Sequence, residues 1–189
     1  MSGPGGHRVA VVVGNPKPAS RTLAAATYVA RELAGDEPDL VVDLATVGPG
    51  LLDQRDPVVG DLVAEVAAAD LVVVASPTYK ATYTGLLKLF LDRFAPDFGT
   101  GMTGLAVPLM LGGGPAHALA PELTLRPVLT EIGAVVPVRA LYVLDAAHDD
   151  PAAYDAWLTT ARPIVTTLLA ARLHARSDAR SDARTGAPA

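Results

Sequence analysis

Five short runs of apolar residues recur along the chain, and longer helix-like segments separate them. The runs at residues 9–13 and 71–74 are wholly apolar, which predicts strands buried on both faces of a parallel sheet. The run at residues 40–44 is expected near a sheet edge, and Pro137 and the alternating Arg139 in the last run also suggest an edge. The predicted strands cover residues 9–13, 40–44, 71–74, 105–111 and 135–143. Because strand and helix alternate, the connections between the strands are expected to be right-handed crossovers. The pattern therefore predicts an α/β fold.

The segments between the strands have the composition of helices, and several carry start or stop signals. Predicted helices cover residues 23–33, 61–69, 85–93, 117–132 and 155–172. Ser20 or Thr22 is suited to cap the first helix, and Gly35 is suited to end it. Pro127 lies inside the fourth helix and leaves the Leu123 carbonyl without its N–H partner. We therefore expect a kink or a π-type bulge around residues 123–127.

All five predicted strands fit into one domain. The chain has 189 residues, half of them hydrophobic, which is enough for a single sizeable core. Residues 175–189 contain Ser-Asp-Ala-Arg twice and have no apolar face. We expect one domain over residues 1–174, followed by a disordered polar tail at residues 175–189.

Charge and composition exclude several classes of function. The formal charge of −5 gives no basic face, so nucleic acid is not an expected partner. The absence of cysteine excludes disulfides, thiol catalysis and thiolate metal sites. No apolar run approaches the roughly 20 residues that a membrane helix needs, and the N-terminus lacks the pattern of a signal peptide. These features predict a cytoplasmic protein without a membrane segment.

Candidate chemistry begins in the loop after the first predicted strand. Hydroxyls and cations gather there at the start of a helix, at Asn15, Lys17, Ser20, Arg21 and Thr22. Free N–H groups at a helix N-terminus, together with cations, favour a bound phosphate. The glycine fingerprints of dinucleotide folds and of P-loops are both absent. On these residues alone, a phosphate site and an ordinary capped helix with solvated cations are equally good interpretations.

Two further loops leave the sheet at the same edge. The loop after the third strand contains the hydroxyls and aromatic rings of residues 76–84, and the loop after the fourth contains Gly112, Gly113 and Gly114. Three glycines allow the backbone to approach a ligand closely, although such a run alone fits a flexible turn as well. In open α/β sheets, ligands bind outside the carboxyl ends of the strands.

Residues 76–80 (Ser-Pro-Thr-Tyr-Lys) and 83–88 (Tyr-Thr-Gly-Leu-Leu-Lys) resemble the flavin loop of NAD(P)H-dependent FMN reductases. The most similar branch supplies reduced flavin to alkanesulfonate-type monooxygenases. Residues 14–17 and 20–22 resemble the family's phosphate loop, with Asn15 in place of the usual serine and Lys17 in place of arginine. The resemblance covers residues 8–172. It implies a flavodoxin-like three-layer sandwich, with a five-stranded parallel sheet in the order 2-1-3-4-5 and helices on both faces.

The resemblance also implies roles for the three loops. It places the FMN phosphate at Asn15, Lys17, Ser20, Arg21 and Thr22, the flavin against Pro77, Thr78, Tyr79 and Lys80, and the pyrimidine edge at Gly112, Gly113 and Gly114. The implied reaction is hydride transfer from NADPH or NADH to FMN. FMN performs the bond-making, so neither a catalytic acid, base or nucleophile nor a metal is expected.

Several alternatives remain open at this point. A quinone or azo-compound reductase would hold FMN tightly and reduce a second bound molecule, and a flavodoxin would only carry electrons. The preference for NADPH or NADH is open as well, as is the partner, for which a two-component flavin-dependent monooxygenase is expected. The family implies a homodimer or homotetramer, with contacts through residues 86–91 and the kinked helix. Leu123 stands where some sulfonate-system members have an aromatic residue.

Overall fold

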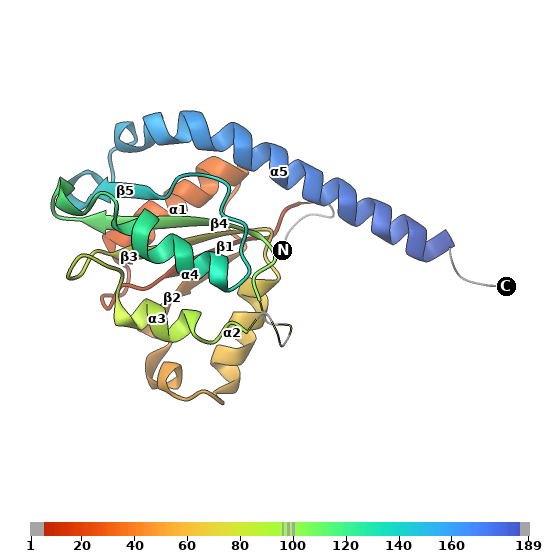
Figure 1. The fold of residues 1–189 in the computed structure, drawn as a ribbon, viewed down its shortest axis with the longest axis horizontal. Coiled ribbons are helices and arrows are strands. Elements are labelled where there is room, and N and C mark those ends of the chain that lie inside the picture. Colours follow the sequence, from red (N-terminus) through yellow and green to blue (C-terminus); the bar gives the residue numbers. More distant parts are fainter. Residues whose placement is uncertain (1–5, 96, 98, 100, 186–189) are drawn as a thin grey trace.

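The computed structural model contains one sheet of five parallel strands in the order β2-β1-β3-β4-β5 (Figure 1). The structure describes residues 6–95, 97, 99 and 101–185. The strands are β1 Val9–Val13, β2 Leu40–Asp43, β3 Leu71–Pro77, β4 Leu105–Gly112 and β5 Leu141–Leu144. This order and the parallel pairing confirm the predicted flavodoxin-like α/β fold.

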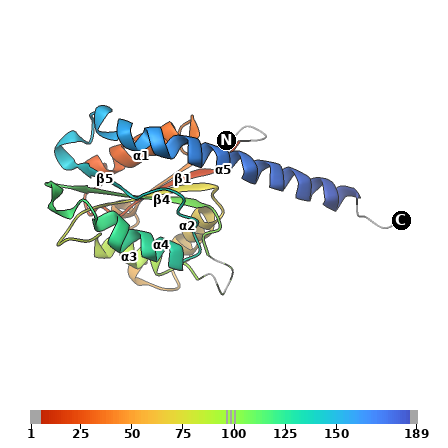
Figure 2. The ribbon, with the colours of Figure 1, turned by 45° about the horizontal axis from the view of Figure 1, so that its top comes forward.

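Helices cover both faces of the sheet. The α-helices are α1 Arg21–Ala34, α2 Pro57–Ala67, α3 Gly85–Leu91, α4 Arg126–Glu131 and α5 Ala152–Thr185. Helices α1 and α5 lie on one face, and α2, α3 and α4 lie on the other, as both views show (Figures 1 and 2). Short 3-10 turns fill the connection that follows β2, at Leu44–Thr46 and Gly48–Leu52.

Both faces of the strands are buried, and alternate residues serve different layers. Val11 and Val73 point to the side of α1 and α5, whereas Val12 and Val74 point to the side of α2, α3 and α4. All four side chains are inaccessible to solvent. Burying such a side chain contributes about 1.5–3 kcal/mol, so these uninterrupted apolar runs specify the central strands strongly.

The first helix starts and ends as its sequence predicts. Ser20 is extended at the N-cap, and its Oγ accepts a hydrogen bond from the Leu23 N–H. Gly35 ends the helix at a φ of 82°, in the left-handed region that glycine adopts without strain. The cap fixes the direction in which the N-terminus of α1 faces, which is toward the carboxyl edge of the sheet.

The bulge predicted in the fourth helical segment is confirmed. A π-helix spans Pro121–Leu125, and the Arg126 N–H donates to the carbonyl of Pro121 five residues earlier. Because Pro127 has no N–H, it cannot continue the ordinary ladder, and the wider turn precedes it. Helix α4 proper is therefore short and starts only at Arg126.

The fifth strand is shorter than predicted. Val135 forms only an isolated parallel bridge with Leu105, and β5 begins at Leu141. The carbonyls of Val136 and Val138 instead accept hydrogen bonds from the Arg126 guanidinium, each at 2.9 Å. A side chain thus satisfies the backbone that a neighbouring strand would otherwise have paired.

Helix α5 is longer than predicted. It begins at Ala152 and runs to Thr185, so residues 175–185, expected to belong to a disordered tail, continue the helix. The alanine and arginine content of this segment favours helix locally even without an apolar face. The end of α5 extends beyond the sheet and the other helices (Figures 1 and 2). Residues 186–189 lie outside the described residues. No helix among those described combines the length and apolar character that crossing a bilayer requires.

Candidate functional site

The loop between β1 and α1 offers unused hydrogen-bond donors. The Ser20 side chain and carbonyl accept from the N–H groups of Leu23 and Ala24. The first two N–H groups of α1, those of Arg21 and Thr22, have no acceptor within the helix. Such a helix N-terminus stabilises a negative charge by about 0.3–1 kcal/mol. This loop therefore presents donors and a positive dipole end to whatever lies above the sheet.

Asn15 organises this loop from within. Its Oδ1 accepts from the Lys17 N–H at 2.9 Å, and its Nδ2 donates to Thr22 Oγ1 at 3.0 Å. The amide thus uses both of its polar ends inside the loop, and Thr22 is almost fully buried. The sequence predicted both residues as phosphate ligands, and in the structure their side chains also hold the loop in shape.

A strained turn carries the second loop. Tyr79 and Thr82 exchange backbone hydrogen bonds of 2.8 and 3.2 Å. Lys80 and Ala81, between them, have φ angles of 51° and 69°. Such a turn needs two residues with positive φ and is normally made by Asn-Gly. Tyr79, at the start of this turn, is 53% exposed.

One hydroxyl in this loop has no partner among the described residues. Thr78 Oγ1 is buried but makes no hydrogen bond, while the Thr78 N–H donates to the Leu111 carbonyl at 2.6 Å. A buried hydroxyl without a partner costs about 1–3 kcal/mol. A bound ligand with a polar group at this position would remove that cost.

Three buried polar contacts join the first and second loops to α3. Thr84 caps α3, and its hydroxyl donates to the Gly14 carbonyl at 2.5 Å. Ser76 Oγ accepts the Thr84 N–H at 3.0 Å. Nearby, burial raises the pKa of Tyr83, so this phenol is neutral at physiological pH. The carboxyl ends of β1 and β3 are thereby held in one fixed relation.

Tyr142 on β5 holds the third loop. Its hydroxyl donates to the Gly114 carbonyl at 2.6 Å. A Cβ added to Gly112 would lie 2.0 Å from the same hydroxyl, so only glycine fits there. The N–H groups of Gly113 and Gly114 donate to no described residue. The glycine loop is therefore fixed from one side while its donors stay available on the other.

A pocket of about 400 Å³ lies where the three loops meet. Its lining residues are Asn15, Lys17, Ser20, Arg21, Pro77, Thr78, Tyr79, Leu111, Gly112, Gly113 and Asp145. The structure thus brings together most of the residues that the sequence singled out. Thr22, Lys80 and Gly114 belong to the same loops but do not line the pocket.

Leu111 and Asp145 line the pocket although sequence reasoning passed over them. Asp145 follows β5 directly. Its position at the carboxyl end of a strand that neighbours β4 is the feature from which its place in the pocket could have been predicted. Its Oδ2 lies 2.5 Å from Arg21 Nη1, and both side chains are partly exposed. The pocket thus contains a carboxylate that competes for the cation expected to hold a phosphate.

Replacing Gly112 by alanine tests the packing of the glycine loop. The new methyl group would displace the Tyr142 hydroxyl and with it the loop, and we expect kcat/KM for FMN to fall about 10-fold. Gly85→Ala is the control, because a Cβ there meets no heavy atom within 4 Å. Adding Tyr142→Phe to Gly112→Ala removes the nearest clashing atom and should restore part of the loss. Equal activity in the Gly112 and Gly85 variants would contradict this account.

Comparison with known proteins identifies relatives over most of the chain. The sequence model of a family described as "NADPH-dependent FMN reductase" matches residues 7–149. FMN reductase (NADPH) of Escherichia coli strain K12 is 31% identical over 143 residues, which cover 74% of each chain. NADH-dependent FMN reductase SfnF of Pseudomonas fluorescens strain Pf0-1 is 30% identical over 138 residues, covering 69% of this chain and 73% of that one.

Solved structures agree with these relatives. The apo form of an NADH:FMN oxidoreductase (EMOB) matches with a TM-score of 0.72 and 29% sequence identity, over 87% of this chain and 89% of that chain. A flavodoxin from the domain Archaea matches with a TM-score of 0.54 and 15% identity, over 85% of this chain and 98% of that chain. The second match concerns the fold alone.

Proposed function

The chain belongs to the NADPH-dependent FMN reductase family and has NAD(P)H-dependent FMN reductase activity, and we propose that FMN binds in the pocket where the three loops meet. The observation that carries this proposal is the convergence of unused donors from three separate loops. The N-terminus of α1, Gly113 with its unused N–H group, and Thr78, whose buried hydroxyl has no partner among the described residues, all line a single cavity. A volume of about 400 Å³ is within the usual range for ligand sites.

The phosphate end of the proposed site lies at α1. Arg21, Lys17 and the first-turn N–H groups of the helix would hold the phosphate by charge-assisted hydrogen bonds. Ser20 is committed to capping the helix, and Asn15 and Thr22 keep the loop in shape. Of the five residues predicted from the sequence as phosphate ligands, Lys17 and Arg21 would therefore bind the phosphate directly. Asn15, Ser20 and Thr22 would hold the loop that positions them.

The ring end lies between the second and third loops. Thr78 Oγ1 would gain a partner there, Pro77 and Tyr79 provide apolar walls, and the Gly113 amide would face the polar edge of the ring. When bound, FMN supplies the chemistry by accepting a hydride from the nicotinamide of NADPH or NADH. The chain's own part is to position the ring and to stabilise negative charge with backbone donors.

We further propose that FMN is exchanged as a substrate rather than held permanently, and that the reduced flavin passes to a two-component flavin-dependent monooxygenase. Two features support exchange. Arg21 is 60% exposed and already paired with Asp145, so the phosphate meets an open and partly neutralised cation. Tyr79, at the rim, is half exposed.

Purification followed by a visible spectrum and equilibrium dialysis tests the site and the exchange together. We expect little flavin to remain after dialysis, and oxidation of NADPH or NADH that saturates with added FMN. Assays with each nucleotide measure the cofactor preference, and assays with FAD and a quinone measure the acceptor range. A stoichiometric flavin that survives dialysis, with turnover independent of added FMN, would refute exchange. Failure to bind FMN at all would refute the proposed site.

Replacing Asp145 by asparagine should tighten FMN binding. The change removes a negative charge beside the phosphate and releases Arg21, and we expect the Kd for FMN to fall about 3- to 10-fold. Equilibrium dialysis measures the effect. The control is Asp149→Asn, which removes a carboxylate beside His148, 3.6 Å away, that does not line the pocket. Weaker binding in the Asp145 variant would mean that this carboxylate positions Arg21 for the phosphate.

We also propose a homodimer or homotetramer that forms through α3 and the π-helical segment. Leu123 in that segment is 68% exposed and Leu119 beside it is 50% exposed, although both are large and apolar. Such residues are typical of protein interfaces when they gather on one surface. Sedimentation analysis of the wild type and of Leu123→Ser tests the contact. A monomer at micromolar concentration would contradict it.

A further inference from the structure

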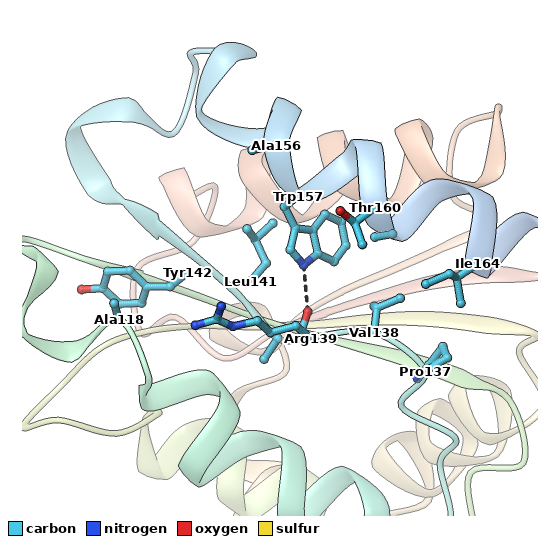
Figure 3. Close-up of a pocket in the computed structure, with 12 residues that line it drawn as sticks. Ala118, Pro137, Val138, Arg139, Leu141, Tyr142, Ala156, Trp157, Thr160 and Ile164 are labelled. Atoms are coloured by element: carbon cyan, nitrogen blue, oxygen red, sulfur yellow. Dashed lines mark hydrogen bonds between the residues drawn. The ribbon is translucent and has the colours of Figure 1, made fainter.

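A second, larger cavity lies at the free edge of the sheet. It is formed between β5, the segment that precedes β5, and α5, and its volume is about 610 Å³ (Figure 3). Its lining residues are Ala118, Pro137, Val138, Arg139, Ala140, Leu141, Tyr142, Ala156, Trp157, Thr160, Ala161 and Ile164. It shares no lining residue with the proposed FMN pocket. We call it the edge groove.

The walls of the edge groove are mainly apolar and aromatic. Trp157 Nε1 donates to the Arg139 carbonyl at 2.8 Å, as Figure 3 shows. The indole thereby satisfies its single polar atom within the protein, and the rest of the ring is apolar surface. Tyr142, Pro137 and Ile164 extend this surface, and Ile164 remains 39% exposed. Such walls suit a ligand with a flat apolar ring system.

One cation in the groove is free of partners within the described part of the chain. The Arg139 guanidinium makes no ion pair or hydrogen bond there, and its side chain extends along the groove toward Tyr142 (Figure 3). Neighbouring arginines are engaged: Arg126 binds backbone carbonyls, and Arg162 pairs with Glu32 at 2.5 Å. Arg139 is therefore available for a carboxylate or sulfonate, whose oxygens match the guanidinium fork.

We propose that the edge groove is a second ligand site, for a planar aromatic anion whose ring packs against Trp157 and whose acidic group meets Arg139. Wall and cation together specify this class, because a neutral aromatic would leave the guanidinium unused and a small polar anion would leave the indole unused. A volume of about 610 Å³ accommodates an aromatic molecule of two to three rings.

Tyr142 connects this site to the glycine loop. Its ring lines the edge groove, while its hydroxyl donates to the Gly114 carbonyl and packs against Gly112. A ligand that contacts the ring of Tyr142 therefore acts on a loop that lines the proposed FMN pocket. Occupation of the groove is linked to FMN affinity, and by reciprocity FMN is linked to occupation of the groove. This linkage rests on the proposed FMN site, whereas binding in the groove does not.

The test uses the full-length protein and 8-anilinonaphthalene-1-sulfonate, an aromatic sulfonate with a planar naphthalene ring. Trp157 is the only tryptophan in the chain, so the emission arises in the wall of the groove, and the Arg139 variant shows whether the dye that quenches it is bound there. We expect saturable quenching of Trp157 as the dye is added. Arg139→Gln should weaken the dye about 10-fold, whereas Arg162→Gln, on α5 outside the groove, should leave it unchanged. N-phenyl-1-naphthylamine lacks the sulfonate, and should bind more weakly and equally to the wild type and to Arg139→Gln.

Three results would overturn the proposal: Trp157 emission that does not respond to the dye, an equal loss in the two arginine variants, or a neutral analogue that binds as tightly as the sulfonate. Emission that changes with protein concentration instead would show that a second copy covers the groove, and would also overturn it. Circular dichroism confirms that the variants are folded.

The linkage between the edge groove and the proposed FMN site is tested by a separate measurement. The Kd for FMN, measured by dialysis with and without saturating dye, should shift at least 3-fold in the wild type. The shift should disappear in Tyr142→Phe, which keeps the ring but loses the bond to Gly114. An unchanged Kd would overturn the linkage, while Trp157 quenching would still decide whether the dye binds. Absence of FMN binding with intact quenching would instead count against the FMN site.

Discussion

Replacing Arg21 by alanine is expected to raise the Kd for FMN about 10- to 100-fold, because a charge-assisted hydrogen bond contributes about 1.5–3 kcal/mol and each 1.4 kcal/mol is tenfold. The Arg21 side chain lines the pocket at the N-terminus of α1, where the helix dipole adds to its charge. Since the loss affects phosphate binding and not the ring, kcat at saturating FMN should change little. Equilibrium dialysis and the KM for FMN measure the two quantities separately.

Arg31→Ala is the matched control for this variant. Arg31 lies in the last turn of the same helix and pairs with Glu37 at 3.4 Å, far from the pocket. Both variants remove one positive charge, so a general electrostatic effect would appear in both. The dependence of the Kd on salt should also be shallower in Arg21→Ala than in Arg31→Ala. An Arg21 variant that binds FMN within twofold of the Arg31 variant would refute the assignment of the phosphate end.

Much of the fold follows from the sequence because its main determinants are local. The runs at β1, β3 and β4 contain only apolar residues over several positions, and such runs suit strands covered on both faces. Ser20 and Gly35 are cap residues with strong preferences, and Pro127, which has no N–H group, disrupts the hydrogen-bond pattern of its own helix. These signals do not depend on distant parts of the chain.

The features that the sequence did not predict come from particular hydrogen bonds rather than from residue propensities. Residues 135–140 read as strand, but the Arg126 guanidinium takes the carbonyls of Val136 and Val138. Ala81 adopts a positive φ because two hydrogen bonds between Tyr79 and Thr82 close the turn, and alanine carries no sequence signal for that conformation. Propensity alone predicts neither feature.

The sequence predicts well which loops form the candidate site, and less well which donor groups in those loops are free to bind a ligand. Topology alone places three loops at one edge of the sheet, so the residues that line the pocket could largely be found from the sequence. Which donors are free depends on hydrogen bonds between loop residues. Asn15 and Thr22 satisfy each other, while Thr78 is left without a partner among the described residues. Asp145 enters the pocket only because β5 lies beside β4.

Replacing Gly14 by alanine should lower the free energy of unfolding by about 3 kcal/mol, at the upper end of the usual cost of overpacking a core. A Cβ at this position would lie 2.3 Å from Leu87 Cβ and 3.0 Å from Leu87 Cα, so α3 must move away from β1. The movement would also break the 2.5 Å bond from the Thr84 hydroxyl to the Gly14 carbonyl. For a chain of this length, the melting temperature should fall by about 6–12 °C.

Two further variants show whether the clash itself is the cause. Gly60→Ala, inside α2, places its Cβ in open space and should stabilise the protein by about 0.5–1 kcal/mol. Adding Leu87→Ala to Gly14→Ala should not restore stability, because alanine keeps the Cβ and Cα atoms that the new methyl group meets. Recovery in the double variant would mean that the outer part of the Leu87 side chain carries the strain. Because Gly14 begins the proposed phosphate loop, FMN binding should weaken in Gly14→Ala even at temperatures where the protein is folded.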